Sequence, residues 1–318
     1  MLLSLLGPLQ TALELGLIAS LTVLALFLSY SMLNVCDLST DGCFTLGAAT
    51  AAVFVLAGHP LLSIPAAMCA GMLSGLVTAF LQTKMGVDSL LAGIIVNTGL
   101  YSVNIGVMGN ASLLNLNKKT TVFTMMSDAL KGTPLAGFSD LIVILIFVGL
   151  AVLLLSLFLR TKLGLAIRAT GNNPDMVKSS SINPVMTIII GLVLANALTG
   201  LSGCLLAEYQ KSVNIQIGTG MVTIALASLL IGEGFFKRSK IPVRAGGAVL
   251  GSFIFRVVYT IALRFNMPAF MLKLVSSVIV VIAISGPYIK SRYPEFHKKR
   301  MRRKQRRQRQ ESEEATHA

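Results

Sequence analysis

Residues 139–159 read SDLIVILIFVGLAVLLLSLFL, an apolar run with one charged residue near its start. A helix needs about 20 apolar residues to cross the hydrocarbon core of a bilayer, and this run has that length. Similar blocks lie at residues 10–30, 61–82, 88–108, 185–207, 245–262 and 268–286, with shorter ones at 44–57 and 221–235. They lack the alternation of barrel strands. The sequence therefore predicts an all-α polytopic membrane protein with eight to ten transmembrane helices, one or two of them broken or re-entrant.

The composition separates an apolar body from a basic tail. Of the 318 residues, 54% are hydrophobic and only 13% are charged, whereas soluble domains have about 25% charged residues. The net charge of +14 is uneven, because eleven Lys and Arg residues lie between Lys290 and Arg309. We expect residues 288–318 to form a disordered cytoplasmic tail, which either contacts anionic membrane lipids or is a solvated segment that only sets the orientation. A nucleic-acid partner is not expected for a chain held in a membrane.

Basic residues in the short loops predict the orientation. The loops at 160–184 and 236–244 carry four Lys or Arg residues each, and such loops face the cytoplasm. Two spans separate them, so the two assignments agree. Two further spans place the C-terminus in the cytoplasm, and the longest loop, 109–138, lies opposite. The side of the N-terminus depends on whether 44–57 crosses the membrane fully, and the sequence leaves this open.

Enzymatic and metal chemistry finds no support in the sequence. Its four cysteines (Cys36, Cys43, Cys69 and Cys204) do not have metal-ligand spacing. The chain contains no Gly-Lys dipeptide and hence no phosphate-binding loop of the Walker type. The sequence shows no nucleophilic side chain paired with a general base, as a catalytic site would require. We therefore expect no catalytic residues, no metal and no cofactor bound by this chain.

The segment at residues 33–48 carries polar residues between two apolar runs, so these residues are expected at membrane depth. Ser39, Thr40 or Asp41 can cap a helix that starts near Gly42. Irregular backbone is tolerated at such depth only where protein or a water-filled cavity surrounds it. A plain cytoplasmic turn is the alternative. Residues 218–228 repeat the pattern of a glycine turn, a threonine three residues later and a run of small residues. Paired segments of this kind mark transporter binding sites, but chance similarity explains the match equally well.

Asn97, Tyr101 and Asn104 have the spacing i, i+4 and i+7, which places them on one helical face. Such a polar stripe either lines an aqueous path or forms hydrogen bonds with a neighbouring helix, and both interpretations stay open. Further ionisable residues lie in or near the spans. For Glu233, Arg256 and Lys273 we expect an ion pair with Glu233 or snorkelling to the interface, with direct substrate contact as the less favoured alternative. For Glu14 we expect a place at the membrane interface.

The cytoplasmic loop at 161–183 divides at Gly171 into two predicted short helices. Residues 163–169 form an amphipathic stretch, and Asn172, Asn173, Pro174 and Asp175 have the chemistry of a helix start. A second helix is expected from Pro174 to about Ser180. Two helices that project into the cytoplasm suit the docking of a partner protein. An ordinary solvated loop is the alternative.

Two of these segments carry a family resemblance. Residues 164–175 (GLAIRATGNNPD) resemble the coupling loop of ABC-transporter permeases of the branched-chain amino acid and ribose importer superfamily. Residues 37–48 (DLSTDGCFTLGA) resemble the broken-helix signature of the same superfamily. With residues 90–95, 100–104 and 108–109, the chain is similar to a branch associated with uptake of tryptophan and other aromatic amino acids. The resemblance covers about residues 10–287, and Val35, Cys36 and Cys43 depart from it.

The resemblance implies a type II ABC importer permease domain at residues 1–287, in the inner membrane of a bacterium. Such permeases work in pairs, here a homodimer, and receive substrate from an extracytoplasmic substrate-binding lipoprotein. ATP is used by a separate cytoplasmic ATPase. The implied ATPase contacts are Arg168, Gly171, Asn172, Asn173, Pro174 and Asp175. The expected translocation path contains Asp37, Ser39, Thr40, Asp41, Thr45, Asn97, Tyr101 and Asn104.

The leading hypothesis is thus a permease subunit of an ATP-driven importer for a small solute, an amino acid and specifically an aromatic one. A sugar or a nucleoside is the alternative substrate class. The alternative mechanism is an ion-coupled secondary transporter, in which Asp37, Asp41 and Glu14 would bind the coupling ion.

Overall fold

The computed structural model describes residues 3–132, 136–236 and 239–264, with single positions between 274 and 285. Six helical segments in this part are long and apolar enough to cross a membrane. They are α1 (Leu3–Leu26) with its π-helical continuation η1 (Phe27–Met32), α3 (Pro60–Thr83), α4 (Ser89–Val107), α6 (Ser139–Phe158), α9 (Pro184–Gln210) and α11 (Ile241–Arg264). Two shorter apolar helices are α2 (Thr40–Leu56) and α10 (Met221–Phe236). The chain is therefore an all-α, multi-pass membrane protein, as predicted.

The apolar blocks of the sequence match these helices closely, with two exceptions. The block at 44–57 starts earlier, at Thr40, because the polar residues before it already belong to α2. The predicted span at 268–286 and the basic tail at 288–318 lie outside the described residues, apart from single positions. The number of spans, eight to ten, therefore stays a prediction.

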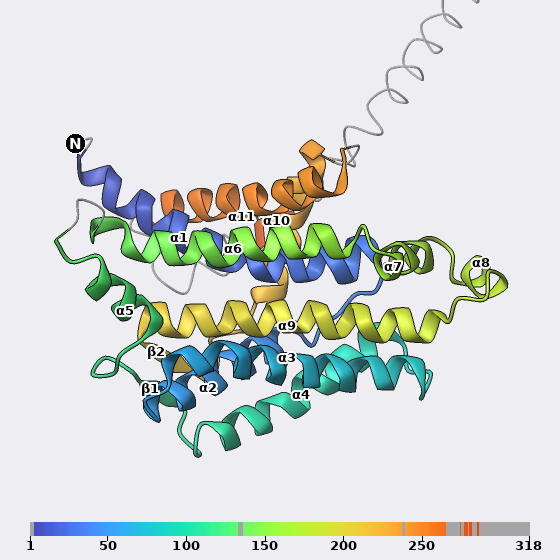
Figure 1. The fold of residues 1–318 in the computed structure, drawn as a ribbon, viewed down its shortest axis with the longest axis horizontal. Coiled ribbons are helices and arrows are strands. Elements are labelled where there is room, and N and C mark those ends of the chain that lie inside the picture. Colours follow the sequence, from blue (N-terminus) through green and yellow to red (C-terminus); the bar gives the residue numbers. More distant parts are fainter. Residues whose placement is uncertain are drawn as a thin grey trace, which may run out of the picture.

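The two ends of the bundle differ (Figure 1). One end carries α7 (Lys162–Asn172) and α8 (Pro174–Ser179), which project beyond the long helices. The other carries α5 (Val122–Ala129), the short turn η2 (Ala136–Phe138) and a two-stranded antiparallel sheet of β1 (Leu113–Asn115) and β2 (Ser212–Asn214), in which Leu113 pairs with Asn214. We call them the hairpin end and the sheet end. The start of α1 lies at the sheet end, because Gln10 Nε2 donates to Gly137 O at 3.2 Å.

Both short helices begin inside the bundle and run in opposite directions. After α1 reaches the hairpin end, residues 33–39 lead back into the bundle, and α2 continues to the sheet end, where Val55 packs with Leu116 and Val213. Residues 215–220 lead inward from the sheet end. From there α10 runs to the hairpin end, where Glu233 meets Ser31 of η1. The predicted broken segment thus crosses the bundle as an irregular stretch followed by a helix.

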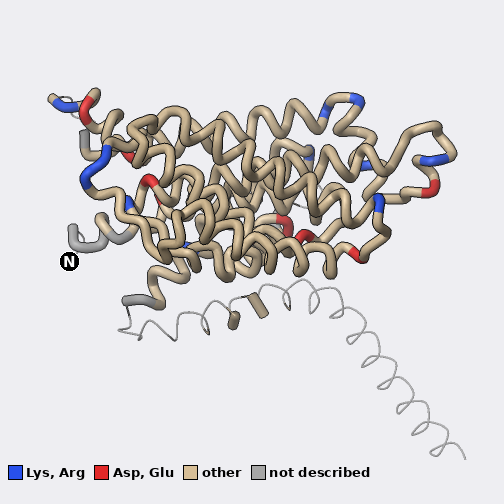
Figure 2. The backbone as a smooth tube through the Cα atoms, turned by 90° about the horizontal axis from the view of Figure 1, so that it is seen from below, with Lys and Arg blue, Asp and Glu red and all other residues tan. Residues whose placement is uncertain are grey.

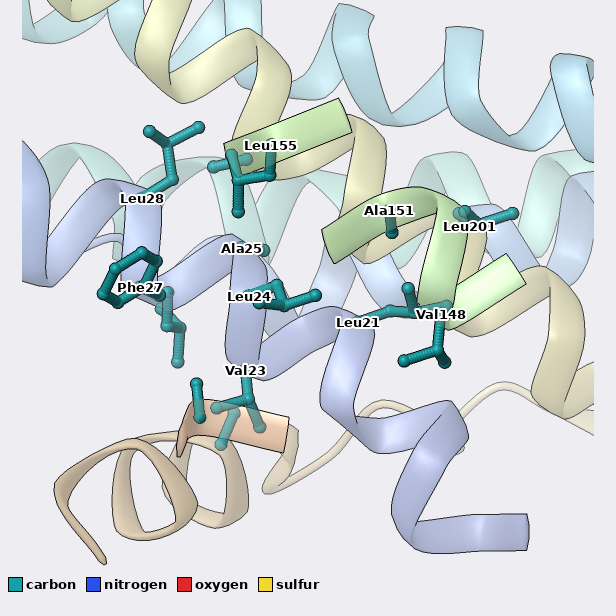
Figure 3. Packing of buried hydrophobic residues seen from close by; sticks show 14 of the residues in the cluster. Leu21, Val23, Leu24, Ala25, Phe27, Leu28, Val148, Ala151, Leu155 and Leu201 are labelled. Carbon is teal, nitrogen blue, oxygen red and sulfur yellow. The ribbon is translucent and has the colours of Figure 1, made fainter. Parts of the chain in front are cut away.

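The core lies around α1 and α9. Within its span, 78% of α1 is buried inside the chain, against 28% of α4, so α1 is central and α4 peripheral. Leu21 and Leu24 of α1 lie near Val148, Ala151 and Leu155 of α6, with Leu201 of α9 beside them, and Phe27 and Leu28 of η1 belong to the same cluster (Figure 3). Charged residues concentrate at the two ends, with few between (Figure 2). This distribution leaves a small number of polar groups at membrane depth, and these define the candidate site.

Candidate functional site: the junction of α2 and α10 and the α7–α8 hairpin

Asp37 anchors the irregular stretch that precedes α2. Its side chain is only 2% exposed. Oδ1 accepts hydrogen bonds from the backbone N (2.9 Å) and Oγ (2.5 Å) of Ser39, and Oδ2 accepts one from Asn196 Nδ2 of α9 at 2.7 Å. A buried carboxylate is tolerated when donors of this number satisfy it. Asp37 therefore fixes the start of α2 against the middle of α9.

Ser39 and Thr40 complete this arrangement. Thr78 Oγ1 of α3 donates to Ser39 Oγ at 3.2 Å, and Thr40 Oγ1 donates to Asp37 O at 3.0 Å. Ser39 occupies the N-cap position of α2, close to the predicted start, but its side chain makes no capping hydrogen bond. The predicted side-chain cap is therefore wrong, because the Ser39 hydroxyl is used by Asp37. Sequence reasoning missed Asn196 and Thr78, whose only signal was a polar residue within an apolar span.

Asp41 joins the two short helices. Its carboxylate accepts hydrogen bonds from the backbone N of Gly220 and of Val222, each at 2.8 Å. Thr45 Oγ1 accepts a third from Gly218 N at 3.2 Å. Asp41 thus caps α10 rather than α2, the helix considered from the sequence. The first N–H groups of a helix lack partners and carry partial positive charge, so this placement stabilises the carboxylate at membrane depth.

The two segments that match in sequence, 37–48 and 218–228, therefore contact each other. Glycine makes this approach feasible at Gly218, where an added Cβ would collide with the Asp41 carbonyl and the Thr45 hydroxyl. Gly220 has φ of +89°, a conformation that favours glycine. We call the contact of residues 37–45 with residues 218–222 the α2–α10 junction.

Of the predicted polar stripe on α4, two residues flank α2. Asn104 Nδ2 donates to Gly42 O at 3.1 Å. For Asn104 the structure thus shows a hydrogen bond with a neighbouring helix, one of the two predicted alternatives. Asn97 faces the same residue, since a Cβ at Gly42 would lie 2.7 Å from Asn97 Oδ1. Tyr101 is 52% exposed. The structure thus brings Asn97 and Asn104, but not the Tyr101 ring, against the start of α2.

The predicted docking residues lie on α7 and α8. The sequence placed the break at Gly171, but α7 continues to Asn172 and the break falls at Asn173, whose Oδ1 accepts from the N of Asp175 and of Met176 at 3.1 Å each. Asn172, Asn173, Pro174 and Asp175 are exposed, and Arg168 is half-buried. α8 ends at Ser179, as predicted to within one residue.

Gly171 connects this hairpin to the core. An added Cβ would collide with the Met32 carbonyl and the Leu33 backbone at the end of η1. The neighbouring Ser31 hydroxyl donates to Glu233, which forms an ion pair with Arg244 at 2.6 Å. Glu233 is thus in an ion pair, as expected, but its partner is Arg244 of the loop predicted as cytoplasmic and not Arg256, and Lys273 lies outside the described residues. η1 therefore contacts both the α7–α8 hairpin and the α10–α11 pair.

Comparison with known proteins assigns the chain to a family. Residues 9–284 match the family described as branched-chain amino acid transport system, permease component. The chain belongs to this family of transport permeases.

Three relatives of the permease are named as transport permeases. A tyrosine transport system permease protein of Clostridioides difficile is 31% identical over 84% of this chain and 86% of its own length. A probable branched-chain amino acid transport permease, LivH, of Methanocaldococcus jannaschii is 27% identical over 86% and 78%. A guanosine ABC transporter permease, NupQ, of Bacillus subtilis is 26% identical over 68% and 70%. No solved structure matches the chain.

The permease contains two buried carboxylates near the sheet end, Glu208 and Glu14, and the sequence pattern did not predict their partners. Glu208 of α9 is fully buried and accepts hydrogen bonds from Val122 N at 2.7 Å and Ser63 Oγ at 2.5 Å, so it ties α5 and α3 to α9. Its signal was an acid directly after an apolar block. Glu14 is 4% exposed and accepts from Tyr209 Oη at 2.7 Å and Gln10 Nε2 at 2.9 Å, so it is held by protein groups, and its place at the membrane interface stays a prediction. In the described residues, no group of three or more His, Cys, Asp and Glu side chains is arranged to hold a metal ion.

Proposed function

We propose that this permease is the membrane-spanning subunit of an ATP-driven importer for an amino acid. Two copies pair as a homodimer, each docks a separate cytoplasmic ATPase, and a substrate-binding lipoprotein delivers the solute on the other side. ATP is hydrolysed by the ATPase and not by this chain. The α7–α8 hairpin carries the proposal, because its exposed polar residues project from the bundle while Gly171 packs directly on the core.

The contacts of η1 support coupling between this hairpin and the path. A push on α7 reaches Met32 and Leu33, and from there residues 33–39 lead to Asp37 and the α2–α10 junction. Irregular backbone at membrane depth lines a path or is enclosed by protein, and paired interrupted segments point to the binding site of a transporter. We therefore propose that the path passes the junction, flanked by Asn97 and Asn104.

We propose the inner membrane of a bacterium as the location, with the hairpin end in the cytoplasm. The basic loop of the hairpin favours this orientation. The start of α1 and the α5 region then face outward, and the C-terminus faces inward if residues 268–286 cross. The basic tail would lie along anionic lipid headgroups.

An aromatic amino acid is the proposed substrate. The relative named for tyrosine transport supports this class, and the one named for branched-chain amino acids supports an amino acid in general. The relative named for guanosine keeps a nucleoside as the alternative. Ion-coupled transport has less support, because internal donors hold the carboxylates of Asp37, Asp41 and Glu14.

Affinity isolation of the tagged chain from its native membrane tests the proposal. An ABC ATPase is expected to co-purify with the wild type, identified by mass spectrometry. The Asn173→Ala variant should lose it, because Asn173 caps α8, whereas a Lys119→Ala control at the sheet end should retain it. Isolation of correctly inserted wild-type protein without any ATPase would overturn the proposed mechanism.

A further inference from the structure

Arg256 lies within α11, one of the helices apolar enough to span the membrane. It is half-buried, and α11 packs closely on α1 here, since a Cβ at Gly16 would lie 3.3 Å from Arg256 Cβ. A cation inside a membrane segment is costly, normally has an anionic partner and marks a substrate or ion pathway by default. The identity of the group that partners Arg256 therefore bears directly on the function of the chain.

Within the described residues, no hydrogen bond or ion pair reaches the Arg256 guanidinium. Its contact is the Tyr259 ring, with Cζ 5.4 Å from the ring centroid. Arg244, earlier on the same helix, provides the contrast, because it is paired with Glu233. The acid expected as a partner for Arg256 is thus already occupied. Glu14, on the adjoining α1, is bonded to Gln10 and Tyr209.

Arg256 lines a small cavity of about 30 Å³. Its walls come from α1, α2, α9, α10 and α11, and they include Phe44, Met221, Ile224 and Ser252. Such a volume holds one small polar group. Met221 and Ile224 belong to the first turn of α10, so the cavity lies beside the α2–α10 junction.

The charge around this cavity favours an anion. Ser252 Oγ is turned away to Gly16 O at 2.6 Å, and the other lining residues besides Arg256 are apolar. The helix start of α10 adds partial positive charge, which Asp41 takes up on the α2 side. Arg256 is then the ionic group that a ligand in the cavity would meet.

We propose that Arg256 binds the carboxylate of the transported amino acid at the start of α10. This rests on the proposed function and assigns the recognition of the main-chain acid to one residue. A guanidinium holds a carboxylate through two parallel hydrogen bonds, whereas an ammonium acts as a point charge. Phe44, Met221 and Ile224 provide an apolar wall for an aromatic side chain. A whole amino acid needs more room than the cavity offers, so binding requires the first turn of α10 to move.

Uptake by the complete complex tests this role. The permease, its ATPase and its loaded binding protein are reconstituted in vesicles, with radiolabelled tyrosine as the probe. Arg256→Gln is expected to lower the maximal uptake rate at least tenfold without changing the concentration of loaded binding protein that gives half the rate. Arg256→Lys should retain about a third of the rate. Lys84→Gln, which removes an exposed cation, should match the wild type.

A binding measurement on the purified permease separates carboxylate recognition from a structural role. Tyrosine should raise the melting temperature of the wild type, since a ligand that binds only the folded state stabilises it, and tyramine, which lacks the carboxylate, should not. Arg256→Gln should fold with an unchanged melting temperature and lose the tyrosine shift.

Other results would overturn either the role of Arg256 or the proposed substrate class. Unimpaired uptake by Arg256→Gln, or equal shifts with tyrosine and tyramine, overturns the role of Arg256 and leaves the proposed function intact. Failure of both Arg256→Gln and Arg256→Lys to fold shows a structural residue and also overturns it. Uptake of a nucleoside and no amino acid by the wild-type complex overturns the proposed substrate class.

Discussion

The α2–α10 junction and the α7–α8 hairpin are built from the same residue types, and they use them in opposite ways. At the junction, Asp37 and Asp41 bond groups 159, 179 and 181 residues away in the sequence, in addition to the local bonds of Asp37 to Ser39. In the hairpin, the Asn173 side chain bonds groups two and three residues away. Polar side chains with distant partners hold the helices together. Those with local partners shape a surface.

Because of this difference, a mutation should lower the free energy of unfolding by different amounts in the two regions. A buried donor or acceptor that loses its partner costs about 1–3 kcal/mol, whereas an exposed substitution usually stays within about 0.5 kcal/mol. Changes at the junction should therefore lower stability and transport together. Changes on the hairpin surface should lower coupling alone.

Asp41→Ala is expected to have the largest effect. It leaves the N–H groups of Gly220 and Val222 without acceptors at membrane depth, at a cost of about 3 kcal/mol or more for the pair. Thermal unfolding of the purified protein measures the loss. Asp128→Ala is the matched control, because Asp128 makes an exposed ion pair with Lys131. Equal melting temperatures for the two variants would remove the distinction between the regions.

Gly171→Ala tests the one hairpin residue that behaves like the junction. The added methyl group meets the Met32 carbonyl and the Leu33 backbone, and overpacking of this kind costs about 1–3 kcal/mol. Gly149→Ala in α6 is the control, since nothing lies within 4 Å of a Cβ there. That change should be neutral or stabilising by up to about 1 kcal/mol. If unfolding shows the same effect for both variants, the hairpin is not packed on η1.

The double variant Asn172→Ala, Asp175→Ala should have the smallest effect on stability. Both side chains are exposed, and the Asp175–Lys178 ion pair at 3.7 Å is worth about 0–1 kcal/mol. The melting temperature should therefore stay near the wild-type value while transport in reconstituted vesicles falls. A large drop in melting temperature would place these residues with the junction instead.

The sequence predicted the helices better than their partners. Apolar length located α3, α4, α6 and α9, because a bilayer requires such lengths whatever the tertiary structure. The polar residues at 37–45 and the hairpin residues at 172–175 were found through local helix-start chemistry. Asn196, Thr78 and Glu208 were not, because a single polar residue in an apolar span suits any neighbouring helix. Which one it bonds depends on contacts between segments 39 to 159 residues apart.

The π-helical segment η1 holds one extra residue, which lets the end of α1 shift without breaking the helix. Leu33 N donates to Leu28 O, five residues back, so this turn holds one residue more than an α-helical turn. Tightening it to α-helical spacing would draw the following chain along by about 1.5 Å and rotate it by about 100°. Ser31 and Met32, which face Glu233 and Gly171, would move with it. Faster hydrogen exchange at the Leu33 amide during ATP turnover than at rest would record the change. In the proposed complex, this shift would let α1 follow a movement of the ATPase without unfolding.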